Sequence, residues 1–234
     1  MADRVRTYIE GVDEAMDGGV PKGNVVLLAG GPGTMKSSVA YSILYHNLNE
    51  KGTKGLYFML EQSRTSFVDH LERLGFDPED TGQDLVVLDL GLLRKNLDIE
   101  QTSWIDLFKM YCKNLKDTSK FEILVIDSID VLSILSAFKE PRKDLFEFLG
   151  FLKGMGVTTF LISEVGDADE RFAHKGEDFL VDGIIQIRMK RFGDVNFQRQ
   201  MRVVKMRGTK HDLAYKTLMF SDMMFETTKV VYDQ

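Results

Sequence analysis

The stretch Val25-Val26-Leu27-Leu28-Ala29-Gly30-Gly31-Pro32-Gly33-Thr34-Met35-Lys36-Ser37-Ser38 joins an apolar run, a glycine-rich turn and the start of a helical segment. Glycines allow successive backbone N–H groups to converge on one point, and the positive N-terminal end of the following helix is directed at the same point. Loops of this kind bind nucleotide phosphates. We therefore predict a phosphate-binding loop over residues 30–38.

Within this loop, Lys36 is predicted to reach the β- and γ-phosphates and Ser37 to bind Mg²⁺. The predicted nucleotide contacts are Gly30, Gly31, Pro32, Gly33, Thr34, Met35, Lys36, Ser37 and Ser38. Met35 stands where the usual pattern has its second glycine. Because it begins a helix, we expect right-handed dihedrals there and a tolerated side chain. The alternative interpretation of the whole stretch is an ordinary glycine-rich turn between a strand and a helix.

From residue 24 onward, short apolar runs alternate with longer segments of helical spacing, which is typical of βαβ units and a mostly parallel sheet. The predicted strands are residues 24–29, 55–60, 85–90, 123–126 and 157–162. The predicted helices are residues 36–48, 65–74, 103–115 and 143–155. Gly52, Gly75 and Gly156 stand where helices should end.

After residue 180 the pattern changes to strands joined by short polar turns, predicted at residues 183–190, 199–206, 215–220 and 229–232. The predicted fold is therefore α/β, with a mostly parallel central sheet flanked by helices and a C-terminal antiparallel meander. We expect residues 1–234 to form one domain, with an entry segment (1–23), a parallel core (24–180) and an antiparallel extension (181–234). The long connection 166–178 lacks apolar periodicity, which favours a functional or mobile loop.

The composition narrows the class of protein. A net charge of −6 argues against a surface built mainly to neutralise nucleic acid. No apolar segment approaches the roughly 20 residues that cross a bilayer, and residues 1–12 are charged, so we expect a cytoplasmic protein without a membrane partner. Cys112, the single cysteine, excludes an intrachain disulfide and is expected to be a small buried residue on a helix.

Polar residues follow three predicted strands at the edge where ligands bind in open α/β sheets. Asp127 is predicted to act beside Ser37 on Mg²⁺, although alone it would also suit a helix N-cap. Glu61 is placed to polarise an attacking water, with a solvated strand-end acid as the alternative. Ser163 and Glu164 either sense the γ-phosphate or cap the next turn.

These features together resemble the RecA superfamily and, more closely, the KaiC-like ATPases, over nearly the whole chain. The segments that carry the resemblance are residues 9–23, the phosphate loop, Ile126-Asp127-Ser128, Leu180-Val181-Asp182-Gly183 and Lys205-Met206-Arg207-Gly208-Thr209-Lys210-His211.

The resemblance implies an ATPase fold that binds ATP or ADP with Mg²⁺ and uses Glu61 to activate water. It also implies that Lys205 and Arg207 reach the nucleotide of a neighbouring subunit and that His211 makes a polar contact to it. We therefore expect a homo-oligomer, by this resemblance a hexamer. The alternative for Lys205 and Arg207 is a solvated basic strand edge. Gln62 stands where many relatives have a second acid, so hydrolysis is expected to be slow or regulated.

Three functions are compatible with these residues. The first is a slow, assembly-dependent ATPase, and the second is a nucleotide-binding regulatory module that presents a surface to an unidentified protein partner. The third is a DNA-binding recombinase, which the acidic charge disfavours. Its support is confined to Arg171, Phe172, His174 and Lys175 in the 166–178 connection.

Overall fold

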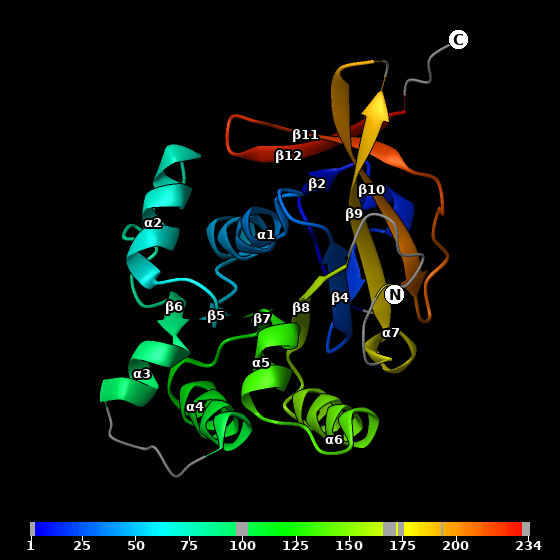
Figure 1. The fold of residues 1–234 in the computed structure, drawn as a ribbon. Helices are drawn as coiled ribbons and strands as arrows, with labels where there is room; N and C mark the ends of the chain where they lie inside the picture. Colours follow the sequence, from blue (N-terminus) through cyan, green and yellow to red (C-terminus); the bar gives the residue numbers. More distant parts are fainter. Residues whose placement is uncertain (1–2, 97–102, 166–171, 173–175, 193, 231–234) are drawn as a thin grey trace.

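The computed structural model describes residues 3–96, 103–165, 172, 176–192 and 194–230. Within them, the centre of the molecule is a ten-stranded sheet with the spatial order β2-β12-β11-β10-β9-β4-β8-β7-β5-β6 (Figure 1). A separate two-stranded ribbon pairs β1 (Arg4–Val5) with β3 (Val20–Pro21). The predicted α/β class with a mostly parallel central sheet is confirmed.

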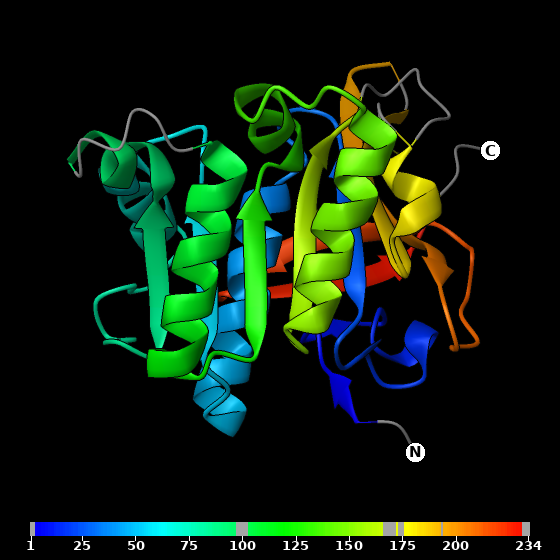
Figure 2. The same cartoon turned by 90° about the horizontal axis from the view of Figure 1, so that it is seen from below.

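Six neighbouring strands of the sheet run parallel. In spatial order they are β9 (Gly183–Phe192), β4 (Val25–Gly30), β8 (Thr158–Glu164), β7 (Ile123–Asp127), β5 (Gly55–Met59) and β6 (Leu85–Asp89). Every residue of β4, β5 and β7 is buried, which explains why these strands are continuous apolar runs rather than alternating ones. Their carboxyl ends lie at one edge of the sheet, where the arrowheads of β6, β7 and β8 point in Figure 2.

Helices cover both faces of the parallel strands (Figure 1). One face carries α1 (Lys36–Lys51) and α2 (Arg64–Arg73). The other carries α3 (Leu90–Asn96), α4 (Trp104–Ser119), α5 (Ile129–Leu135) and α6 (Pro141–Gly154). Each of the helices in the described part of the chain is too short or too polar to cross a membrane.

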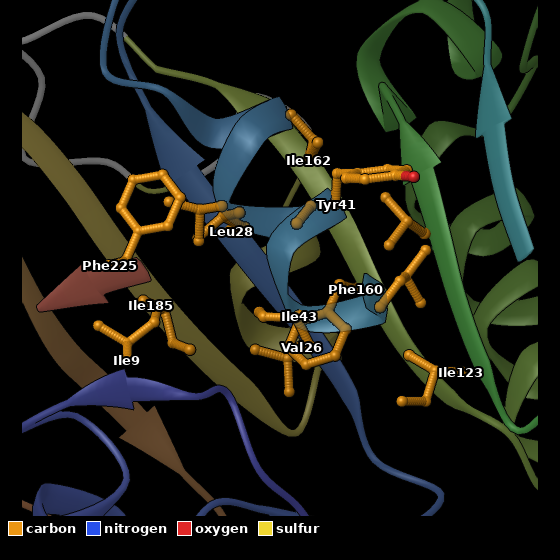
Figure 3. Close-up of a cluster of buried hydrophobic side chains, with 14 of the residues drawn as sticks. Ile9, Val26, Leu28, Tyr41, Ile43, Ile123, Phe160, Ile162, Ile185 and Phe225 are labelled. Carbon is orange, nitrogen blue, oxygen red and sulfur yellow. The ribbon is translucent and has the colours of Figure 1, made fainter. Parts of the chain in front are cut away.

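Two apolar clusters hold these layers together. The α1-side cluster packs α1 and α2 against one face of the sheet, and Figure 3 shows side chains from α1, the parallel strands and β12 meeting in it. The α4-side cluster packs α4, α5 and α6 against the opposite face and includes Phe108 and Phe148. Cys112 of α4 is fully buried in it, as predicted, and burial raises the pKa of its thiol.

The C-terminal part extends the sheet with antiparallel strands, as predicted. After β9 follow β10 (Asn196–Met206), β11 (Lys216–Ser221) and β12 (Met224–Lys229), and β2 (Ile9–Glu10) completes the edge beside β12. The entry segment is anchored by buried Asp13, whose carboxylate accepts hydrogen bonds from the Thr7 amide and hydroxyl, both at 2.8 Å, and from the Tyr8 amide at 3.1 Å.

The prediction of a last strand at residues 229–232 is wrong. The strand ends at Lys229, and residues 231–234 lie outside the described part of the chain. Asp222 and Met223 both have positive φ, 49° and 61°, and form a two-residue turn between β11 and β12. A turn of this kind favours Asn-Gly or Asp-Gly, so Asp-Met gave no turn signal.

Three of the α-helices among the described residues were also not predicted. They are α3, α5 and the four-residue α7 (Glu177–Leu180), which begins where a long connection was expected to continue. Ser128 rather than Asp127 caps α5, with its Oγ accepting a hydrogen bond from the Val131 amide at 3.3 Å. Each of the three has at most seven residues, which is too short to show clear helical periodicity.

Candidate nucleotide-binding site

The phosphate loop joins the carboxyl end of β4 to the first turn of α1, as predicted. Thr34 Oγ1 donates a hydrogen bond to the Gly31 carbonyl at 2.8 Å and closes the loop on itself. Lys36, Ser37 and Ser38 are the first three residues of α1, so their amides have no partner within the helix. These free donors and the helix N-terminus fit a phosphate group.

Gly30 is required by the packing of two strands rather than by its dihedrals. A Cβ at this position would lie 2.3 Å from the carbonyl oxygen of Ile187 on β9 and 3.0 Å from Thr34 Oγ1. The absence of a side chain therefore allows β9 to pair closely with β4 where the loop begins.

The expectation of right-handed dihedrals at Met35 is wrong. Met35 precedes the first helical residue and has φ 69° and ψ 27°, in the left-handed region. A residue with a Cβ is strained there by about 1–2 kcal/mol. The thioether side chain is half-buried against the α1-side cluster, which offsets part of that strain.

The predicted magnesium ligands lie together. Ser37 Oγ donates a hydrogen bond to Asp127 Oδ2 at 2.7 Å, and the buried Tyr57 hydroxyl donates to the same oxygen at 2.7 Å. Burial raises the pKa of Asp127, against the opposing effect of these two hydrogen bonds. A hydroxyl and a carboxylate are oxygen donors of the kind that Mg²⁺ prefers, so the pair fits this ion. The described residues contain no cluster of three or more His, Cys, Asp or Glu able to hold a metal by themselves. The fit is therefore to an ion that takes its other ligands from phosphate and water.

Lys36 is the first residue of α1, and its side chain reaches back to the loop. Its Nζ donates to the Gly31 carbonyl at 2.9 Å. Burial lowers the pKa of the Lys36 ammonium, while the nearby carboxylates of Glu164, Asp127 and Glu61 act in the opposite direction. The lysine is thus a partly desolvated cation surrounded by acids, in a position to contact a phosphate anion.

Glu61 lies on an exposed segment two residues beyond β5. Its Oε1 accepts a hydrogen bond from the Oγ of Ser128, the residue that follows Asp127. The Leu60 amide donates to the Asp127 carbonyl at 2.8 Å, so the ends of β5 and β7 are tied together. The structure therefore brings Glu61, Asp127, Ser37 and Lys36 to one edge of the sheet.

The third strand end contributes in a different way. Ser163 is buried, and its Oγ has no hydrogen-bond partner among the described residues. Glu164 is exposed, and its amide donates to Asp130 Oδ2 at 2.8 Å. Neither Ser163 nor Glu164 caps a described helix, and the sensing role stays a prediction.

Sequence reasoning missed two residues that border the loop. A cavity of about 470 Å³ beside residues 33–38 is also lined by Gln62, His70 and Arg199. Arg199 Nε donates to the Gly33 carbonyl at 3.2 Å, and His70 Nε2 lies 3.0 Å from Ser38 Oγ. Arg199 comes from β10, 166 positions along the chain from Gly33. No local pattern links such distant residues, so Arg199 is revealed only by strand pairing and His70 only by the packing of α2 against α1.

Lys205, Arg207 and His211 do not meet the phosphate loop of their own chain. Met206 pairs with Gly183 at the start of β9, and Gly183 also pairs with Val26 near the start of β4. The loop begins four residues further along β4, roughly 13 Å away along the strand. Within one chain the cationic pair thus lies toward the amino ends of the parallel strands.

There, the two cations bind the segment around α7. Lys205 Nζ donates to the carbonyls of Val181 at 2.7 Å and Asp178 at 2.9 Å. Arg207 donates to the Phe179 carbonyl at 3.0 Å and to Asp182 Oδ1 at 3.1 Å. Burial, and next the charge of Arg207, lower the pKa of the Lys205 ammonium.

Asp182 also accepts from Lys153 Nζ at 2.8 Å and from the Val25 amide at 3.1 Å. Burial by itself raises the pKa of Asp182, but the hydrogen bonds from Lys153, the Val25 amide and Arg207, together with the charge of Lys153, lower it below its ordinary value. His211 Nδ1 lies 3.1 Å from the Thr209 carbonyl, in the turn after β10.

Of the four residues that supported nucleic-acid binding, Arg171, His174 and Lys175 lie outside the described residues. Phe172 is half-buried against the α4-side cluster, with the Arg202 guanidinium 5.9 Å from its ring centre. Phe172 is therefore partly covered by its own chain.

A parallel sheet with helices on both faces and a phosphate loop after β4 defines a P-loop protein of the RecA type. A family model described as "ATPase: KaiC" matches residues 5–226. The chain belongs to this family of KaiC-like ATPases, and it is accordingly a nucleotide-binding protein of an ATPase family.

Relatives match this chain over nearly its whole length. A UPF0273 protein of Pyrobaculum aerophilum is 30% identical over 229 residues, which are 94% of this chain and 80% of that protein. A UPF0273 protein of Thermotoga maritima is 29% identical over 223 residues, with 91% and 90% covered. Among solved structures, the KaiC-like protein PH0186 of Pyrococcus horikoshii superposes with a TM-score of 0.83 at 26% identity and covers 97% of this chain and 100% of that one.

Proposed function

We propose that residues 1–234 act as one cytoplasmic ATPase domain that hydrolyses MgATP slowly within a homo-oligomer, which the family resemblance suggests is a hexamer. In this proposal, Lys205, Arg207 and His211 of one subunit serve the nucleotide of the next. The observation that carries it is the location of the cationic pair, toward the opposite end of the parallel strands from the phosphate loop. A pair so placed can act on a nucleotide only from another subunit.

The remaining chemistry lies within one chain. The loop amides and Lys36 bind and orient the triphosphate, and Ser37 with Asp127 would hold Mg²⁺. The bound ion would supply Lewis-acid stabilisation of charge that develops on the phosphate oxygens. Glu61 would accept a proton from the attacking water, which requires a carboxylate lone pair directed at that water.

Two observations support slow turnover. The Glu61 carboxylate accepts a hydrogen bond from Ser128 Oγ, which occupies one of its acceptor positions and restrains its movement toward an attacking water. Gln62 follows it where many relatives place a second acid, so one carboxylate alone is available at this position.

The test combines sedimentation with phosphate release. In the presence of MgATP, wild-type protein should sediment as a larger particle than without nucleotide. Arg207→Ala should keep nucleotide binding but lose about 10²-fold in turnover, the range observed when a preorganised donor to a developing charge is removed. Lys229→Ala, which removes an exposed cation at the end of β12, should turn over as wild type does. Full activity of Arg207→Ala would contradict a trans-acting arginine.

The hydrogen bond from Ser128 to Glu61 also favours a second candidate function, a regulatory module that binds nucleotide and presents a surface to a protein partner without hydrolysing it. In that case Glu61→Gln and wild type would release phosphate at the same negligible rate. A clear loss of phosphate release in Glu61→Gln would exclude this second candidate.

A further inference from the structure

In the described part of the chain, one side-chain hydrogen bond joins the helix after Glu61, α2, to the phosphate loop. His70 on α2 places Nε2 3.0 Å from the Oγ of Ser38 in the first turn of α1. Both residues line the cavity of about 470 Å³ beside the loop. Among the described residues, no other side-chain hydrogen bond connects α2 to the loop or to α1.

The rest of the attachment of α2 is apolar. Phe67 and Leu71 are fully buried in the α1-side cluster, and His70 projects from the exposed side of the helix. Apolar packing is non-directional, so it holds α2 against the core without fixing the tilt of the helix toward the loop. A hydrogen bond has a preferred length and angle and can fix that tilt.

The position of α2 constrains Glu61 from one side, while the end of β5 and the hydrogen bond from Ser128 hold it from the other. Arg64, the first residue of α2, is three positions after Glu61, and Ser63 caps the helix by accepting from the Ser66 amide at 3.3 Å. The segment from Glu61 to α2 is therefore short and fixed at its far end. A shift of α2 relative to α1 would move the Glu61 carboxylate relative to the phosphates that α1 binds.

Ser38 can transmit the presence of a nucleotide because its hydroxyl has one proton and can also accept. Its amide is among the free donors of the first turn of α1, and its side chain faces the same cavity. When the hydroxyl donates to a phosphate oxygen, the only role left toward His70 is acceptance from an imidazole N–H. Phosphate, Ser38 and His70 then form one chain of hydrogen bonds with a single direction.

We propose that His70 is a positioning residue, which fixes α2, and with it Glu61, against the nucleotide-bearing loop through Ser38. This inference rests on the proposed hydrolytic function and adds a residue that acts through another rather than on the reacting atoms.

The kinetic test uses His70→Ala, Ser38→Ala and the double variant. His70→Ala should lower kcat about tenfold, as expected for one lost hydrogen bond, while the affinity for ADP changes less than about twofold. The double variant should lose no more than the more impaired single variant, because both remove the same link. His70→Gln should recover most of the rate, because its Nε2–H can donate to Ser38. Asp69→Ala is the matched control on the exposed side of the same helix and should behave as wild type.

A second measurement does not depend on turnover. Hydrogen exchange of the amides in residues 64–73 should slow when ADP binds to wild type and to His70→Gln, and should slow less in His70→Ala. If wild type hydrolyses no ATP while this exchange pattern holds, the proposed function fails and the His70 link stands.

Three results would overturn the link itself. They are unchanged exchange and kcat in His70→Ala, additive losses in the double variant, or a loss of ADP affinity as large as the loss in kcat. The last would make His70 a direct nucleotide contact.

Discussion

Met35 offers the sharpest test of the loop geometry, by comparing Met35→Gly with Met35→Ala. Both substitutions remove the same side chain, so the contacts of Met35 with the α1-side cluster are lost in both. The difference in unfolding free energy between the two variants therefore reports mainly on the backbone at this position.

The expected difference follows from the left-handed dihedrals. Glycine escapes the strain of about 1–2 kcal/mol that a Cβ causes there. Its greater freedom in the unfolded chain costs about 0.4–1 kcal/mol relative to alanine. Met35→Gly should therefore be the more stable variant by roughly 0.5–1 kcal/mol. In a right-handed conformation the order reverses, since glycine would then be less stable than alanine by roughly 0.5–1 kcal/mol.

The assay is urea unfolding of both variants without nucleotide, under identical conditions. For a chain of this length, 1 kcal/mol corresponds to about 2–4 °C in Tm, so thermal scans give an independent reading. ADP binding by both variants would show that the loop still forms. If Met35→Ala proves the more stable, the left-handed conformation is refuted and the reasoning about strain fails with it.

Three further predictions concern stability. Because the folded-state pKa of Asp182 is lowered, the stability that its carboxylate contributes is present above pH 3.8. That stability is lost as pH falls through the folded-state pKa. Asp182→Asn should therefore be less stable by about 1.5–3 kcal/mol at pH 7 and lose less stability than wild type below about pH 4, measured by urea unfolding between pH 7 and 3. Gly30→Ala should lower the unfolding free energy by about 2–3 kcal/mol through overpacking. Gly150→Ala, at an open position within α6, should raise it by about 0.5–1 kcal/mol in the same assay. Asp13→Ala leaves buried donors of the entry segment unpaired and should lower Tm, by roughly 4–8 °C for a loss of about 2 kcal/mol.

The sequence was sufficient to predict structure where neighbouring residues carry the pattern. The run from Val25 to Ser38 predicted a strand, a loop and a helix start, because burial on both faces makes the strand continuously apolar and the glycines mark the turn. The meeting of Asp127 with Ser37 was also predictable, since the carboxyl ends of parallel strands share one edge of the sheet.

Prediction failed where conformation or contact depends on distant parts of the chain. The left-handed Met35 is tolerated in the presence of a cluster that packs its side chain, which its own sequence neighbours do not reveal. Arg199 and His70 reach the loop through strand pairing and helix packing, at separations of 166 and 32 residues from their partners. The Asp222-Met223 turn has the geometry of an Asn-Gly turn without its residues.

Lys205 and Arg207 donate hydrogen bonds to the peptide carbonyls around α7. In the proposed assembly these carbonyls compete for the two cations with a phosphate of the adjoining subunit. A phosphate on an adjoining subunit would have to displace those carbonyls, or share the donors with them, to recruit the cations. Release of the carbonyls would leave the last turn of a four-residue helix without its cap. Assembly around a nucleotide would then compete with local order at residues 177–181. A less ordered α7 in one subunit would indicate that the neighbouring subunit has bound nucleotide.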